Sequence, residues 1–135
     1  MKYHLDASTI IDVMRFHRES LLNFELANIE DLAMSSIVAH ELWAGANNAN
    51  VGPRALATLR LFTSMIEVIP FDKQAAESSG ALVAKLTRDG IGIGNMDPMI
   101  AGHALSQKAV LVTRNIKHFK RVTDLQVLDW SKHGG

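Results

Sequence analysis

Five short stretches of mainly apolar residues, separated by polar segments, have the length and pattern of β-strands. Helical patterns occupy the segments between them, so the apolar period changes repeatedly along the chain. The predicted strands are YHL at 3–5, AMSSI at 33–37, EVIPF at 67–71, AVLVT at 109–113 and LQVLD at 125–129.

The intervening helices are predicted from their apolar spacing and their end signals. The first begins at Ser8 or Thr9 and runs to about Arg15, Pro53 suits a first helical turn, and Gly90 suits the position after a last turn. The other predicted helices span 20–28, 38–46, 53–65, 72–88, 97–106 and 116–121. Strands that alternate with helices indicate an α/β fold with a mainly parallel central sheet of four to five strands flanked by helices, and residues 1–135 are expected to form one domain.

Polar residues follow two of the predicted strands at their carboxyl ends, where parallel sheets bind ligands. Asp6 follows the first strand, and Thr113 to Asn115 follow the AVLV strand. Asp97 begins a helix that leads into the AVLV strand. Because such a helix runs antiparallel to its strand, its first residue returns to the same edge, and we expect these positions to converge there.

Each acid of this group also has an ordinary structural explanation. Asp97 precedes Pro98 and could be a helix N-cap, and Asp6 could cap the helix that follows it. The helical neighbours of Glu41 are Ile37, Val38, Ala44 and Gly45, and no Lys or Arg lies within reach on the same helix. Its carboxylate therefore either turns to solvent or a distant Arg, or shares a hard cation with other carboxylates. Asp12, beside Ser8, Thr9, Arg15 and Phe16, is interpreted as a surface residue.

Charge and composition narrow the classes of protein that fit. The formal net charge is zero, which argues against a generic nucleic-acid binder, but residues 107–123 hold five Lys or Arg, one His and no acid. This indicates either a localised electropositive face or a solvated helix surface. The absence of Cys excludes disulfides, thiolate zinc sites and a cysteine nucleophile. Because the chain has no apolar run of membrane-spanning length and no signal-peptide pattern at its start, a cytoplasmic protein without membrane contact is expected.

Several segments together resemble a known family. LDAST near the N-terminus, SSIVAHELWAGA, GNMDPMIAGHAL, LVTRNIKHFKRV and the closing VLDW occur in the order found in PIN-domain ribonucleases, and more narrowly in the VapC toxins of bacterial toxin–antitoxin pairs. The resemblance extends from Tyr3 to Trp130. It implies a PIN-like three-layer fold and an acidic pocket that holds Mg²⁺ or Mn²⁺.

The resemblance also assigns roles to individual residues. The motif acids of the family match Asp6, Glu41 and Asp97, which are therefore expected to be the catalytic and metal-binding residues. Asn115 stands at a position that is often Asp in the family. Because an amide cannot supply a charged ligand, the number of bound metal ions, one or two, stays open. The usual Asn of the family is replaced by Ser8, which can still hydrogen-bond a carboxylate or a metal-bound water.

The implied activity is metal-dependent endonucleolytic cleavage of structured RNA, including tRNA, that inhibits translation. Ser8, Thr113 and Asn115 would support the pocket, and the basic stretch would hold the RNA backbone, notably through Arg114, Lys117 and Arg121. The implied partners are a VapB-like antitoxin, whose C-terminal segment fills a groove beside the pocket, and a second copy of the chain. We expect a homodimer, a higher assembly with the antitoxin, and an interface region formed by helices 8–15, 20–28 and 53–65.

Two other functions are compatible with an acidic pocket at a sheet edge. The missing fourth acid makes a PIN domain that binds RNA without cutting it conceivable. A receiver-like phosphoacceptor module also needs acids and Mg²⁺. It is disfavoured because only Asp6 follows the first strand and Arg114 stands where such a module needs a lysine.

Overall fold

The sheet at the centre of the protein consists of five parallel strands. In the computed structural model, residues 1–48 and 50–132 are described. The strands are β1 (Tyr3–Leu5), β2 (Leu32–Ser35), β3 (Glu67–Ile69), β4 (Val110–Val112) and β5 (Val127–Leu128). They are ordered β3-β2-β1-β4-β5, and each neighbouring pair is parallel. The expectation of a mainly parallel sheet with four to five strands is confirmed.

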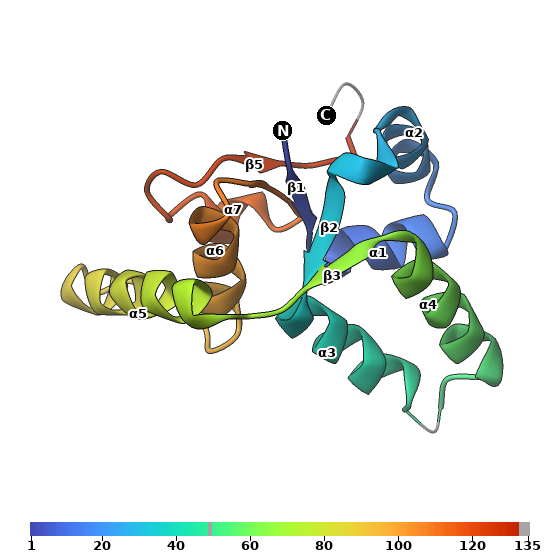
Figure 1. The fold of residues 1–135 in the computed structure, drawn as a ribbon, viewed down its shortest axis with the longest axis horizontal. Helices are drawn as coiled ribbons and strands as arrows, with labels where there is room; N and C mark the ends of the chain where they lie inside the picture. Colours follow the sequence, from blue (N-terminus) through green and yellow to red (C-terminus); the bar gives the residue numbers. More distant parts are fainter. Residues whose placement is uncertain (49, 133–135) are drawn as a thin grey trace.

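Helices cover both sides of this sheet and give the fold three layers (Figure 1). On one side lie α1 (Ala7–Met14), α2 (Arg18–Leu26), α3 (Ser36–Ala46) and α4 (Pro53–Met65). On the other side α6 (Asp97–Ser106) contacts β2 and β4, and α5 (Lys73–Arg88) packs on α6. The short helix α7 (Ile116–Phe119) adjoins β5, and a 3₁₀ turn spans Ile29–Asp31. Within the described residues, no helix has the length and apolar character needed to span a bilayer.

Most helix ends follow the sequence signals. Pro53 occupies the first turn of α4, and the carboxylate of Asp72 caps α5 by accepting a hydrogen bond from the Ala75 N–H at 2.9 Å. Gly90 follows the end of α5 with φ of +69°, a backbone conformation that glycine adopts without steric cost. Local chemistry therefore determines where these helices begin and end.

Several predicted boundaries differ from the structure, and two of them differ because a side chain has a different partner. The N-cap of α1 is Asp6 rather than Ser8 or Thr9, since Asp6 Oδ1 accepts from the Ala7 N–H at 2.9 Å. Thr9 Oγ1 donates instead to the Val112 carbonyl at 3.1 Å, which ties α1 to β4. The strand predicted over 33–37 ends at Ser35, whose hydroxyl accepts from the Ile37 N–H and begins α3.

The contact between α5 and α6 depends on a glycine. A Cβ added at Gly102 would lie 2.5 Å from the backbone Cα of Ser79, closer than any real contact. Only a hydrogen fits at this position, so the two helix backbones approach closely. This helix carries Asp97 at its first residue.

Two histidines are buried where α6 crosses the sheet. His4 in β1 and His103 in α6 are 1% and 0% exposed, with perpendicular rings whose centroids are 5.2 Å apart. His103 Nδ1 is 2.7 Å from the hydroxyl of Ser35, whereas the other three ring nitrogens have no hydrogen-bond partner in the described structure. Burial lowers the pKa of His4 from 6.5 to about 4, with a smaller contribution from His103. His4 is therefore neutral in the folded protein near neutral pH.

The strand order has its switch point between β1 and β4. From β1 the chain adds β2 and β3 on one side, and then returns to add β4 and β5 on the other. At such a switch point the connections leave in opposite directions and open a crevice beyond the strand ends. Asp6 and Thr113, which follow β1 and β4, stand on either side of it.

Candidate active site

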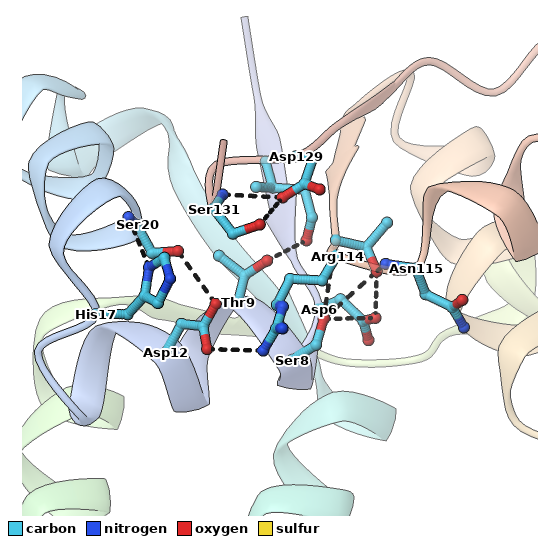
Figure 2. Close-up of polar contacts among 12 residues, drawn as sticks. Asp6, Ser8, Thr9, Asp12, His17, Ser20, Arg114, Asn115, Asp129 and Ser131 are labelled. Atoms are coloured by element: carbon cyan, nitrogen blue, oxygen red, sulfur yellow. Dashed lines mark hydrogen bonds and ion pairs between the residues drawn. The ribbon is translucent and has the colours of Figure 1, made fainter. Parts of the chain in front are cut away.

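Asp6 is a buried carboxylate at this crevice, held by hydrogen bonds from three residues. Besides the Ala7 N–H, the Thr113 hydroxyl donates to Asp6 Oδ2 at 2.8 Å. The Ser8 hydroxyl donates to the same oxygen at 3.4 Å, and Figure 2 shows Ser8 and Asp6 next to each other. Asp6 as a whole residue is only 8% exposed. Burial raises its pKa, and the three hydrogen bonds act in the opposite direction. Asp6 thus both caps α1 and keeps a fixed orientation at the site.

Glu41 comes from the middle of α3 and lacks the compensation expected of a buried carboxylate. Its Oε1 atom is buried and has no hydrogen-bond partner among the described residues. Burial, followed by the charges of Asp6 and Asp97, raises the pKa of Glu41 from 4.5 to about 6. The suggestion that its head group turns to solvent or meets an Arg does not account for this buried, unpartnered oxygen.

Asp97 is the first residue of α6 but is not its N-cap. The cap position belongs to Met96, and no side chain caps this helix end. Asp97 Oδ2 instead lies 2.8 Å from His118 Nδ1 in α7, with both side chains 27% exposed. Burial and the charge of Asp6 raise the pKa of Asp97, while His118 lowers it. The N-cap explanation for this acid is therefore wrong.

The three acids form one electrostatic group. Asp6 raises the pKa of both Glu41 and Asp97, and Asp97 raises that of Glu41. The three carboxylates are therefore close enough for their charges to interact. Positions 6, 41 and 97, far apart in sequence and on three different elements, are thus brought together at the carboxyl edge of the sheet.

The predicted supporting residues converge on the same place. Ser8 Oγ lies 3.5 Å from Thr113 Oγ1 and accepts a hydrogen bond from the Arg114 N–H at 3.2 Å. The Asn115 N–H donates to Thr113 Oγ1 at 3.0 Å. These contacts join the loop after β4 to the beginning of α1 and leave the Asn115 side chain exposed beside His118, 3.0 Å from its Nδ1.

The basic residues near the site have different environments. Arg114 Nη1 pairs with Asp12 Oδ1 at 3.1 Å, and Asp12 Oδ2 accepts from the Ser20 hydroxyl at 3.2 Å (Figure 2). The interpretation of Asp12 as a surface residue is wrong, because it is 6% exposed and links α1, α2 and the loop after β4. Lys117 and Arg121 are exposed on and after α7.

The donor set suits a hard divalent cation. Carboxylate oxygens are the ligands that Mg²⁺ and Mn²⁺ prefer, and the unpartnered Oε1 of Glu41 is an acceptor without a donor. Among the described residues, no group of three or more His, Cys, Asp or Glu side chains is arranged to hold a metal ion. Asp97 Oδ2 is directed at His118 Nδ1 rather than at another carboxylate.

An apolar cavity of about 500 Å³ opens beside Glu41. It lies between α1, α3 and α4, and its walls include Ile11, Met14, Arg15, Leu42, Arg54 and Leu59. Glu41 is its only lining acid among the described residues. The cavity is therefore a mostly apolar groove with two arginines at its border and the acidic site at one end.

Fold and site together define an α/β protein with an acidic centre at the switch point of a parallel sheet, and comparison with known proteins identifies its family. The PIN domain family matches residues 3–125. Ribonuclease VapC2 of Rickettsia felis is 37% identical over 134 residues, 98% of this chain and 100% of the relative. The tRNA(fMet)-specific endonuclease VapC of Salmonella typhimurium is 36% identical over 130 residues, 96% and 98% of the two chains. The crystal structure of DNA-bound VapBC from Salmonella typhimurium superposes with a TM-score of 0.90 at 37% identity, and 96% of this chain and 98% of that chain are covered.

The chain therefore belongs to the PIN-domain family and, within it, to the VapC ribonucleases. This confirms the resemblance drawn from the sequence motifs. It also argues against the receiver-like alternative.

Two residues of the site were not assigned by sequence reasoning. His118 was counted only as part of the basic stretch, although it contacts Asp97. Asp12 was dismissed because its sequence neighbours are polar, whereas its partner Arg114 is 102 residues away. A signal for His118 was present in its spacing, because a residue three positions after Asn115 on a helix lies on the same face.

Proposed function

We propose that the chain is a divalent-metal-dependent endoribonuclease whose catalytic and metal-binding residues are Asp6, Glu41 and Asp97. The observation that carries this proposal is the buried, unpartnered Oε1 of Glu41, whose pKa is raised by burial and by the charges of Asp6 and Asp97. Carboxylates that repel one another are poised to bind a cation, which removes the repulsion. The chain acts as a single domain, in the cytoplasm, where its RNA substrates are found.

The residues have distinct tasks. A bound Mg²⁺ or Mn²⁺ supplies an activated water near neutral pH and offsets the charge that develops on the phosphate. Asp6, fixed by Thr113 and the Ala7 N–H, gives a rigid ligand, and Asp97 a movable one. Glu41 binds the ion directly or through water, or orients the nucleophile. Ser8 and Asn115 border the site and can hydrogen-bond a bound water or a phosphate oxygen.

The RNA backbone is held by the exposed basic residues that follow β4. Lys117 and Arg121 are free to contact phosphates, and each contact adds affinity that falls with salt. Arg114 is 54% exposed in its side chain despite its pairing with Asp12. Arg114 contributes a positive charge whose position is fixed by the ion pair with Asp12. Transfer RNA is the first substrate class to test, because the Salmonella typhimurium relative is named a tRNA(fMet)-specific endonuclease.

The apolar groove between α1, α3 and α4 suggests how the nuclease is restrained. The Salmonella typhimurium structure is a VapBC complex. We infer that this chain likewise binds a VapB-like antitoxin, whose C-terminal segment fills the groove that ends at Glu41. A homodimer, and a higher assembly with the antitoxin, are supported by exposed apolar side chains on and after α2 and on α4. These are Leu22, Leu26, Ile29, Leu61 and Met65.

A second candidate function is RNA binding without cleavage. It is favoured by Asn115, which cannot supply a charged ligand, and by the open arrangement of the acids. Metal uptake separates the two functions, since a binder that has lost catalysis would show no uptake of Mn²⁺.

The decisive experiment compares Asp6→Asn and Asp97→Asn with the parent protein in Mg²⁺ and in Mn²⁺. RNA cleavage, followed by mapping of new 5′ ends, is expected to be lost in both variants, because each loses a charged ligand while keeping its size. Asp124→Asn, at an exposed position outside the site, serves as the matched control and keeps activity. Circular dichroism establishes that each variant is folded. Cleavage that survives in both folded variants would remove the proposed mechanism.

A further inference from the structure

The contact between His118 and Asp97 joins α7 to the first residue of α6. His118 Nδ1 in α7 lies 2.8 Å from Asp97 Oδ2 at the first residue of α6. The same nitrogen lies 3.0 Å from Nδ2 of Asn115. A single ring nitrogen thus has two close polar neighbours at the border of the acidic crevice.

These two contacts cannot both be satisfied as they stand. Toward an ionised carboxylate Nδ1 must donate, whereas toward the amide NH₂ group it must accept, and one nitrogen does only one of these. A half-turn of the Asn115 amide exchanges its oxygen and nitrogen positions. After this turn, the Nδ1–H has two acceptor oxygens beside it. When the proton is on Nε2 instead, Nδ1 also offers a lone pair, and three lone-pair atoms then surround the position of that proton.

Three such atoms around one proton also form part of a cation site. Ligand atoms on adjacent corners of an octahedral ion with bonds of about 2.1 Å are separated by roughly 3 Å. The separations of 2.8 and 3.0 Å at Nδ1 match this spacing. Asp97 already belongs to the proposed metal site, so its partner on α7 is within reach of the same ion.

We propose, on the basis of the proposed function, that His118 Nδ1 is a ligand of the divalent ion together with Asp97, with the Asn115 amide oxygen beside it. The consequence is selectivity. Imidazole nitrogen favours Mn²⁺ and the later transition ions, whereas Mg²⁺ strongly prefers oxygen ligands. A site that contains the His118 imidazole and the neutral Asn115 amide therefore binds Mn²⁺ in preference to Mg²⁺.

A purely positioning role for His118 makes a different prediction. If the imidazole only oriented Asp97 by hydrogen bonding, its removal would weaken every ion by a similar factor, because all ions use the same carboxylate. If it is a ligand, its removal selectively weakens the ion that prefers nitrogen. The ratio of the two affinities therefore separates these roles where activity alone would not.

The test measures Mn²⁺ binding by electron paramagnetic resonance and Mg²⁺ binding by competition, for the parent protein, His118→Ala and His40→Ala. His40 is the matched control, because it is an exposed histidine next to Glu41 in α3. His118→Ala is expected to lower the ratio of Mn²⁺ to Mg²⁺ affinity by about tenfold, because Mn²⁺ gains more from a nitrogen ligand than Mg²⁺ does. Electron spin echo spectra of bound Mn²⁺ are expected to show modulation from an imidazole nitrogen that persists in His40→Ala and disappears in His118→Ala.

Other outcomes have separate meanings. Mn²⁺ binding without imidazole modulation in the parent protein, or an equal loss of both affinities in His118→Ala, would overturn the ligand role and leave the nuclease proposal intact. Absence of any metal uptake by the parent protein would instead remove the metal-dependent function on which this inference rests. If His118→Ala does not fold, the parent protein carrying ¹⁵N-histidine decides the question, because the modulation must change with the isotope.

Discussion

Glu41→Gln is expected to make the metal-free protein more stable while it removes activity. The substitution replaces a carboxylate by an uncharged amide of nearly the same size. In the metal-free protein this relieves the repulsion from Asp6 and Asp97 and the cost of burying an unpartnered charged oxygen. The site is thus predicted to trade stability for the capacity to bind a cation.

The magnitude follows from the shift of the Glu41 pKa from 4.5 to about 6. Such a shift corresponds to at most roughly 2 kcal/mol, at 1.36 kcal/mol for each pKa unit. Because the side chain is only partly buried, solvent screening reduces this to about 1 kcal/mol. For a domain of this size, that change raises Tm by approximately 3–5 °C.

The pH dependence of the difference has a definite sign. Above pH 6 Glu41 is ionised in both the folded and the unfolded chain. The full free-energy cost of burying its charge then lowers the stability of the folded state. As the pH falls through 6 toward 4.5, the folded chain takes up a proton before the unfolded chain does, and the cost disappears. The stability gain of Glu41→Gln is therefore present above pH 6 and absent below 4.5.

Chemical denaturation of parent and variant across this pH range, with metal removed by chelation, measures the difference directly. Titrations of other groups cancel when the two proteins are compared at the same pH. Glu77→Gln, an exposed position on α5, controls for the general effect of removing a carboxylate. A Glu41→Gln protein that is less stable than the parent above pH 6, or a difference that does not change with pH, would refute the reasoning.

Two further predictions concern packing and RNA affinity. Gly102→Ala is expected to destabilise the fold by about 1–3 kcal/mol in urea denaturation, because its Cβ would meet the Ser79 backbone at 2.5 Å. Gly80→Ala, a helical glycine with open space around it, should instead stabilise by up to about 1 kcal/mol, and equal effects would contradict the packing argument. Lys117→Ala is expected to weaken RNA binding and to reduce the slope of log affinity against log salt by about 0.7, in filter-binding or fluorescence titrations. Lys108→Ala, at the opposite edge of the sheet, should leave that slope unchanged, and a similar loss in both would refute a localised contact.

The fold could be predicted from the sequence because its signals are local. The strands at 3–5, 67–71 and 109–113 and the helices at 53–65 and 97–106 follow from apolar spacing and from end residues such as Pro53. The boundaries that failed depended on long-range contacts. Thr9 could not be excluded as a cap without knowing that its hydroxyl bonds to Val112 of β4.

The sequence was sufficient to predict which acids lie near one another. A residue at the end of a parallel strand, or at the start of a helix that returns to it, must lie at the carboxyl edge of the sheet. The finer chemistry of the site was not predictable. The partner of Asp97 is His118, 21 positions later, and the partner of Asp12 is Arg114. Such pairs depend on where a loop passes after β4, which neither propensity nor spacing encodes.

The buried His4 in β1 limits the stability of the protein in acid. Between pH 6.5 and about 4, His4 binds a proton in the unfolded chain but stays neutral in the folded chain. Acidification over this range therefore progressively favours unfolding. Glu41 is neutralised earlier, near pH 6. Because Glu41 is proposed to serve the reaction, we expect its protonation near pH 6 to lower activity reversibly while the fold persists.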